Sequence, residues 1–346
     1  MKNIIDNEWR EAVYQYCDLL GKDSLLVQGA GGNISWKDQE TLWIKASGTW
    51  LADACIQDIF VPVQLPPILQ AIYVGNFNVI PTCPEGCRLK PSIETLLHAL
   101  MPHKVVAHLH AIDILAHLVR ENYLEDIKFA LSDSTLRWTS VVYRQPGAIL
   151  AEAVYFALLA EPKSEVIFLQ NHGVIIGGAD IAEVDLILRE LLQRFKIVPI
   201  VQFPMFPVDQ ERIILDDQIE YALVGDQAIQ ALATCVALYD RLATDWALYP
   251  DHIVFLGEKA HFYDSIDSFR SKMLFHEGSP PELIFVREVG VFATQQFNSG
   301  KQAQLRCYYD ILLRQAPENV LNALSESDVL ALLHWDAERY RLTVAK

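Results

Sequence analysis

The sequence lacks any run of about 18 apolar residues, the length that a transmembrane helix needs. Its first residues, MKNIIDNEWREAVYQYC, contain neither an apolar core nor a small-residue cleavage site, so no secretory signal is expected. Basic residues are fewer than acidic ones. The sequence has 28 Lys and Arg and 44 Asp and Glu, which gives a formal net charge of −16. Such a charge repels the phosphate backbone. We therefore expect no membrane partner and no nucleic-acid partner.

Cysteine is scarce, with six residues in a chain of 346. Because no export signal is expected, we interpret all six as reduced thiols of a cytoplasmic protein. Cys83 and Cys87 form a C-x3-C pair in a loop rich in proline and glycine. A metal site would need a second pair nearby, and the sequence has none, so we expect two free thiols.

Hydrophobic residues make up 51% of the sequence and charged residues 21%, the balance of a globular protein. Domains usually run to roughly 100–200 residues, so the length predicts two domains. The segment IVPIVQFPMFPVD holds three prolines, which places the boundary within 197–216. We predict one domain at 1–198 and a smaller α/β domain at 217–346.

Apolar residues recur at helical or strand periods along the chain. In the first region the pattern predicts helices at 7–20, 92–100 (with Ser92 as N-cap), 148–160 and 180–196, and strands at 41–48, 104–111 and 165–170. In the second region it predicts a long helix near 217–245, strands at 252–257 and 283–294, and helices at 262–274, 299–314 and 326–342.

Five of the ten histidines lie between 98 and 117. Side chains alternate along a strand, so His108 and His110 point to the same side and form half of a site for a divalent metal. His172 directly follows a buried strand, and Gly173 removes a side chain beside it, which suits a third ligand. Each feature also has a structural interpretation, as a hydrogen-bonded pair of histidines and as a turn histidine.

Glu94 is the candidate acid or base. It lies in the first turn of a predicted helix, where a carboxylate is electrostatically stabilised. A short loop joins this helix to the strand that carries the two histidines, so the carboxylate can reach a metal and move protons to and from a bound substrate. The alternative is that Glu94 only stabilises its own helix and contacts His98 one turn later.

The segment GAGGNIS (29–35) is rich in small residues, whose backbone N–H groups can form an anion-binding concavity. It lacks the Gly-Lys-Ser/Thr ending of a P-loop, and it fails the dinucleotide pattern G-x-G-x-x-G at Ile34. Ser47 and Gly48 end a strand, and Ser92 begins a helix, so these positions offer further donors. The alternative is that all of them form flexible turns.

Six short motifs, taken in order, resemble those of the class II aldolase/adducin family. They are GGNIS (31–35), KASG (45–48), PSIE (91–94), HLH (108–110), QPG (145–147) and NHG (171–173). The resemblance covers roughly 1–196 and is greatest to the aldolase half of bifunctional rhamnulose-1-phosphate aldolase/lactaldehyde dehydrogenase proteins. It implies a three-layer α/β/α sandwich with a central, mostly antiparallel sheet, and a homotetramer. A weaker similarity to the segment that joins the two halves of those proteins continues beyond residue 200.

The resemblance also implies a role for each site residue. It makes His108, His110 and His172 the ligands of Zn²⁺ or another divalent metal, and Glu94 the acid/base. The substrate phosphate would contact Gly32, Asn33, Ser47, Gly48 and Ser92. The implied enzyme is a class II aldehyde-lyase that cleaves a C–C bond of a ketose or ketose phosphate through a Zn-stabilised enediolate.

Two departures from the family pattern keep alternatives open. Ile93 stands where members with a phosphate site often carry a second Ser, so an unphosphorylated substrate is the alternative. Lys45 could add positive charge, lie on the outer face of its strand, or form a Schiff base. The same scaffold serves sugar-phosphate 4-epimerases and decarboxylases, and adducin-like members use it as a non-catalytic interaction module. The leaving aldehyde needs a second proton donor, for which Tyr143 is the candidate.

Overall fold

The computed structural model describes residues 2–200, 212–215, 219–276 and 278–344. The chain divides into two compact units. The first comprises the described residues up to Ile197 together with those from His334 onward, and the second runs from Val198 to Leu333. The second domain predicted from the sequence, 217–346, includes the residues after 333, which belong to the first unit here. None of the helices in the described ranges has the length and apolar character needed to cross a membrane.

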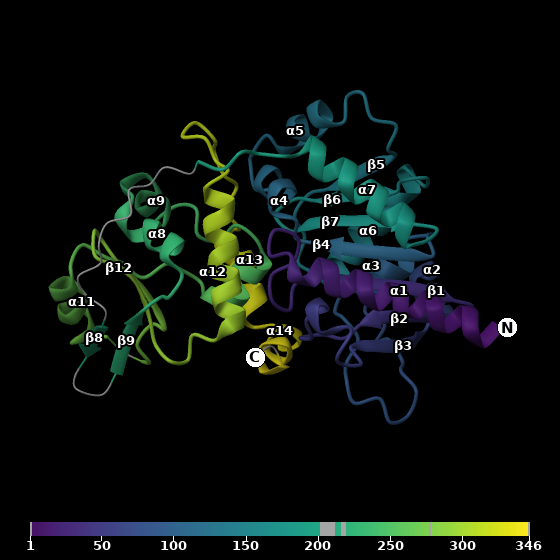
Figure 1. Cartoon of the computed structure of the whole chain (residues 1–346), viewed down its shortest axis with the longest axis horizontal. Coiled ribbons are helices and arrows are strands. Elements are labelled where there is room, and N and C mark those ends of the chain that lie inside the picture. The colour runs from purple at the N-terminus through teal and green to yellow at the C-terminus, as the bar shows by residue number, and fades with distance from the viewer. Residues whose placement is uncertain (1, 201–211, 216–218, 277, 345–346) are drawn as a thin grey trace. The chain divides into compact units, whose positions relative to one another are not determined.

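The first unit is built on a seven-stranded sheet in the order β3-β2-β1-β4-β7-β6-β5 (Figure 1). Its strands are β1 (Asn33–Asp38), β2 (Thr41–Lys45), β3 (Phe60–Gln64), β4 (Val105–Leu109), β5 (Trp138–Val141), β6 (Val166–Leu169) and β7 (Gly173–Gly178). Neighbouring strands are antiparallel except for β5 and β6, which are parallel. The predicted α/β class is confirmed, and the central sheet is mixed with mostly antiparallel pairs.

The first unit also contains helices. They are α1 (Lys2–Lys22), η1 (Leu51–Asp53), α2 (Leu65–Tyr73), α3 (Thr95–Leu100), α4 (Ile112–Leu118), α5 (Tyr123–Ala130), α6 (Ala148–Ala160), α7 (Ile181–Arg194) and α14 (Asp336–Val344). Apolar side chains of α2, α3 and α6 form one buried cluster with strand residues such as Val106, Ile167 and Ile175. Alternation along each strand places these residues on one face. Burial of this face fixes the register of β4 against β7.

The second unit contains a five-stranded sheet in the order β10-β11-β12-β9-β8. Its strands are β8 (Arg212–Leu215), β9 (Ile219–Leu223), β10 (Phe262–Tyr263), β11 (Leu283–Val286) and β12 (Gly290–Ala293). Its helices are η2 (Gln227–Gln230), α8 (Ala231–Thr234), α9 (Val236–Arg241), α10 (Pro250–Leu256), α11 (Ile266–Met273), α12 (Ser299–Leu312) and α13 (Glu326–Leu333). Tyr221, Phe269 and Phe292 lie in its buried core.

Two element predictions for this unit are wrong, and one is confirmed. The region 217–245 is not one long helix, because β9 and three short helices occupy its described residues. The predicted strand at 252–257 is helix α10, which has Pro250 in its first turn. A short apolar run such as HIVFL does not distinguish a strand from a buried helix by period. The strand structure expected at 283–294 is present, as the antiparallel pair β11 and β12. Most of the predicted boundary, residues 201–211, lies outside the described residues.

Candidate metal centre

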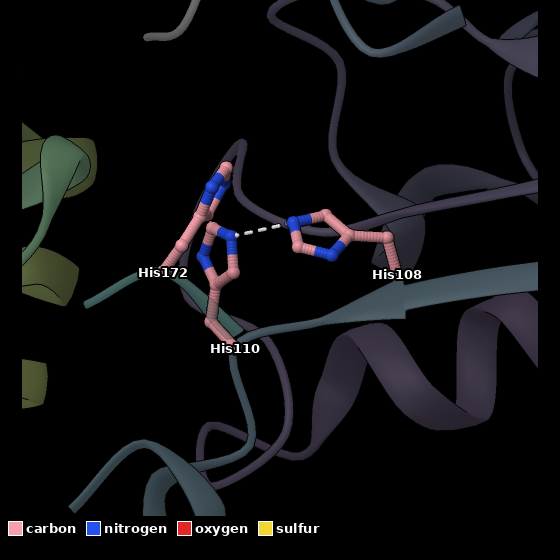
Figure 2. A group of neighbouring side chains, drawn as sticks. All are labelled: His108, His110 and His172. Carbon is pink, nitrogen blue, oxygen red and sulfur yellow. Dashed lines mark hydrogen bonds between the residues drawn. The ribbon is translucent and has the colours of Figure 1, made fainter. Parts of the chain in front are cut away.

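Three histidines converge at one end of the central sheet. His108 lies on β4, His110 follows the end of that strand, and His172 lies in the turn between β6 and β7. Because β4 pairs with β7, with Leu109 opposite Val174, the two segments are held side by side. Figure 2 shows the three rings facing one another, with centroids 4.9, 4.9 and 5.7 Å apart. One ligand nitrogen from each ring lies within 4.8 Å of the others, and all three side chains are buried.

The backbone selects the form of His108 that can bind a metal. Its Nδ1 lies 3.2 Å from the carbonyl oxygen of Val174, which can only accept a hydrogen bond. A proton on Nδ1 leaves the lone pair on Nε2. This Nε2 faces Nε2 of His110 at 3.1 Å (Figure 2). The ring is therefore oriented toward the centre of the cluster by an atom outside it.

Gly173 allows the close approach of the two strands. A Cβ on this residue would lie 2.5 Å from the carbonyl oxygen of Leu109, 3.1 Å from Cδ2 of His110 and 3.2 Å from Cε1 of His108. The nearest of these atoms belongs to the backbone and cannot rotate away. A side chain at position 173 would therefore separate the two segments that carry the histidines.

Glu94 faces the histidine cluster as an ionised carboxylate. Its Oε1 lies 3.0 Å from Nε2 of His172 and 3.4 Å from Nε2 of His108. Its Oε2 accepts a hydrogen bond of 2.7 Å from the amide of Asn33. Burial raises the pKa of Glu94, but electrostatic attraction to His108 and His172 and a hydrogen bond with His172 outweigh it, so the pKa lies well below the usual range. One oxygen is fixed by Asn33 and the other points at the cluster.

Ser92 does not cap the helix as predicted. Helix α3 begins at Thr95, with Glu94 at the N-cap position. The Ser92 hydroxyl instead accepts hydrogen bonds from the backbone N–H of Glu94 (3.2 Å) and from the amide of Asn33 (3.3 Å). Ser92 thus helps to orient the segment that carries the carboxylate.

Gly32 and Asn33 lie beside the strand that carries two of the histidines. Asn33 pairs with His108 in the register of β1 and β4. Gly32 has a φ of +61°, and a Cβ there would lie 3.1 Å from the carbonyl oxygen of His108. Only glycine takes this conformation without strain and also leaves room for the neighbouring strand.

The turn that contains Ser47 and Gly48 is joined to the segment before Ser92. The backbone N–H of Ser47 donates to the carbonyl of Lys90 at 2.9 Å, and Ala46 forms a β-bridge with Pro91. The structure thus links the KASG and PSIE motifs directly. The GGNIS motif joins them through the hydrogen bonds of Asn33.

Lys45 is buried, so the alternative that it lies on an outer face is wrong. Its ammonium donates to the carbonyl of Ala30 at 3.2 Å and to that of Thr49 at 2.6 Å. These carbonyls belong to the glycine-rich loop and to the turn after β2. The positive charge therefore lies between two of the segments expected to bind an anion. In the sequence, the position of Lys45 among the apolar residues of a strand is the feature that could indicate its burial.

Two other histidines between 98 and 117, His98 and His117, have hydrogen-bond partners. Nδ1 of His98 lies 2.7 Å from the hydroxyl of Ser35, and burial lowers the pKa of His98 to about 3, so the ring is neutral at pH 7. His117 lies 2.8 Å from a carboxylate oxygen of Asp126.

Tyr143 follows β5, and its backbone N–H donates to the side chain of Gln170, just before the NHG turn.

The donor set fits a divalent transition metal. Three imidazole nitrogens with a carboxylate beside them are the ligands that Zn²⁺ prefers, and imidazole also suits copper, iron and nickel. Oε1 of Glu94 is buried and has no hydrogen-bond donor other than these histidines among the described residues. A cation at this point would compensate the buried negative charge.

A family model and a curated relative match part of this chain. The family model described as the class II aldolase and adducin N-terminal domain matches residues 11–197. The protein named uncharacterized oxidoreductase YuxG of Bacillus subtilis is 26% identical over 188 residues. That match covers 49% of this chain and 26% of YuxG, so the chain spans about a quarter of the length of this curated relative.

Two solved structures are similar to this chain over about half of its length. The N-terminal class II aldolase domain of a conserved protein from Thermoplasma acidophilum is 26% identical, covering 53% of this chain and 90% of that chain, with a TM-score of 0.44. An L-fuculose-1-phosphate aldolase from Thermus thermophilus is 19% identical, covering 54% of this chain and 91% of that chain, with a TM-score of 0.36.

Proposed function

The chain belongs to the class II aldolase and adducin family, and on this premise we propose that it is a metal-dependent aldehyde-lyase. Its substrate is a ketose or a ketose phosphate, and the bond that it breaks is a C–C bond. The observation that supports this proposal most strongly is the buried group of His108, His110 and His172 with the carboxylate of Glu94 at 3.0 Å from His172. A non-catalytic module would have no need to keep a carboxylate and three imidazoles together in its interior.

Each residue of the site has a distinct part in this proposal. The three histidines would hold the cation, which would supply a Lewis acid for the oxygen of the substrate carbonyl. Glu94 exchanges the proton at the nucleophilic carbon through Oε1. Asn33 holds Oε2, so the carboxylate cannot rotate away from the substrate.

The substrate's anionic end is proposed to bind at Gly32, Asn33, Ser47, Gly48 and Ser92. The hydrogen bonds that link their three segments support a common pocket. Lys45 adds a buried positive charge between two of these segments. A local cation of this kind offsets the overall charge of −16, which would otherwise repel a phosphate.

We also propose that the metal is Zn²⁺, that the protein is cytoplasmic and that it forms a homotetramer. An exposed apolar groove of about 340 Å³ between α2 and α6 supports self-association, because large exposed apolar patches mark interaction surfaces. Leu69, Tyr73 and Leu159 line this groove, and each is more than 40% exposed. Metal analysis of protein purified without chelator and light scattering on the same sample test the metal and the assembly.

A retro-aldol screen tests the activity. Phosphorylated and free deoxy-ketoses would be incubated with metal-loaded protein, and the aldehyde product measured. Glu94→Gln preserves the shape of the side chain but not its basicity, so we expect kcat to fall about 10²–10⁴-fold. Glu125→Gln, an exposed glutamate on α5, is the matched control and should have no effect.

The products distinguish this reaction from its relatives. Release of an aldehyde identifies an aldolase, inversion at C4 an epimerase, and release of CO₂ a decarboxylase. Full activity in Glu94→Gln would show that the role given to Glu94 is wrong. Less than stoichiometric metal that reconstitution cannot restore would contradict the metal-dependent proposal as a whole.

A further inference from the structure

The helix α14 returns to the first unit after the second unit has been completed. It lies against the turn that contains Gly48. A Cβ on Gly48 would be 2.6 Å from Cβ of Val344, 2.9 Å from its Cγ1 and 3.2 Å from the carbonyl oxygen of Arg341. Gly48 has a φ of +80°, so this residue permits both the turn and the approach of the helix.

Two further contacts join this segment to the candidate substrate site. The ammonium of Lys90 lies 4.4 Å from the centre of the Tyr340 ring, a cation–π contact. The indole ring of Trp335 lies 2.9 Å from the position that a Cβ on Gly147 would take. The segment from Trp335 to Val344 therefore contacts the KASG turn, the residue before the PSIE motif and the QPG motif.

The buried face of α14 carries charged residues. Glu338 is 2% exposed and Arg341 is 8% exposed, and Nη1 of Arg341 lies 3.4 Å from Oε2 of Glu338. Arginine and glutamate are almost never buried without a compensating partner, and a helix normally buries apolar residues. Residues three apart share one face of a helix, so Arg341 lies on the same face as Val344, one turn closer to Trp335. The carbonyl oxygen of Arg341 would lie 3.2 Å from a Cβ on Gly48, so this residue lies next to a candidate phosphate-binding position.

We propose that α14 forms a wall of the substrate pocket and that Arg341 is a specificity-determining residue that binds the phosphate group of the substrate. This inference rests on the proposed function, because it takes the pocket to be that of a sugar phosphate. The planar guanidinium matches phosphate oxygens in a bidentate arrangement. Lys45 and Lys90 add positive charge to the same segments. Glu338 fixes the orientation of the guanidinium and at the same time weakens its attraction for an anion.

The two members of the buried pair therefore have opposite effects on phosphate binding. In the full-length protein, the dissociation constant of inorganic phosphate would be measured by calorimetry, with and without chelator. Arg341→Met should raise it about tenfold or more, because a hydrogen bond to a charged group is lost. Arg341→Lys keeps the charge and should retain most of the affinity. Glu338→Gln removes the competing negative charge and should lower the dissociation constant.

The control is Arg339→Gln, an exposed arginine on the same helix that pairs with Asp336. It should leave phosphate binding unchanged. In the lyase assay, Arg341→Met should raise KM for the phosphorylated substrate with little change in kcat, and should not affect an unphosphorylated analogue.

Weaker phosphate binding in both Arg341→Met and Glu338→Gln would overturn the proposal. If the pair were purely structural, removal of either residue would disturb the site and weaken binding. Unchanged phosphate affinity in Arg341→Met would overturn it as well. If Arg341→Met does not fold, Arg341→Lys and Glu338→Gln still test the proposal. The first should retain most of the phosphate affinity, and the second should lower the dissociation constant. Phosphate binding that depends on Arg341, in a protein without lyase activity, would refute the proposed reaction and leave this inference standing.

Discussion

Replacement of Gly173 by alanine tests whether the close approach of β4 and β7 builds the metal centre. The added Cβ would lie 2.5 Å from the carbonyl oxygen of Leu109, far inside van der Waals contact. Leu109 lies between His108 and His110, and residue 173 follows His172. The change therefore acts on all three candidate ligands through the backbone and removes none of them.

The expected magnitude follows from this geometry. The overlap involves backbone on both sides, so the strand ends must separate by several tenths of an ångström or more. Overpacking of a buried site costs about 1–3 kcal/mol of the free energy of unfolding. Displacement of ligands without their loss typically lowers metal affinity about 10–100-fold. We expect both effects in Gly173→Ala.

Competition with a chromophoric chelator measures the metal affinity, and urea unfolding of the chelated protein measures stability. The matched control is Gly225→Ala, because a Cβ at position 225 would meet no atom within 4 Å. The control should bind metal as the wild type does. Wild-type metal affinity in Gly173→Ala would refute the reasoning, because the clash would then have been absorbed without moving the histidines.

Three other outcomes follow from the structure. Burial lowers the pKa of His252 to about 3, below its unfolded value near 6.5. The unfolded state therefore binds more protons, and the free energy of unfolding falls as the pH drops through this window. When urea unfolding is measured at pH 7, 6 and 5, His252→Phe should reduce the slope of the free energy of unfolding against pH by up to about 1.4 kcal/mol per pH unit. Asn33→Ala should lower kcat about 10–100-fold while metal content stays unchanged, because Glu94 loses the partner of Oε2; loss of metal instead would contradict this separation of roles. Asp180→Ala removes the side chain that accepts a hydrogen bond from the N–H of Glu183 at the start of α7. The loss should destabilise the protein by about 1 kcal/mol. An unchanged midpoint of thermal unfolding would show that this cap does not contribute to stability.

The histidine cluster is the part of the candidate site that the sequence predicts best. His108 and His110 follow from the period of a strand, because a two-residue spacing places both side chains on one face. The position of His172 depends on the pairing of β4 with β7, which no local pattern contains. The family resemblance supplied that long-range information, and the structure brings the three residues together.

The functions of polar side chains were harder to predict, because they depend on partners distant in sequence. Ser92 has the sequence of a helix cap, but its hydroxyl binds Asn33, 59 residues away. Two other features were hard to predict for the same reason. The burial of Lys45 depends on tertiary contacts, and tertiary contacts also decide that the short apolar run at α10 is a helix and not a strand. The contact between α14 and the Gly48 turn joins residues almost 300 positions apart, and no periodicity could have indicated it.

The return of α14 to the first unit also has a consequence in time. During synthesis, the three candidate ligands and Glu94 have all been translated once residue 172 has left the ribosome. The 136 residues from Val198 to Leu333 must then be translated before Trp335 and Val344 can reach their contacts. At roughly 5–20 residues per second this takes about 7–27 s. During this interval the candidate metal ligands and Glu94 have been synthesised, while α14 cannot yet contact the Gly48 turn.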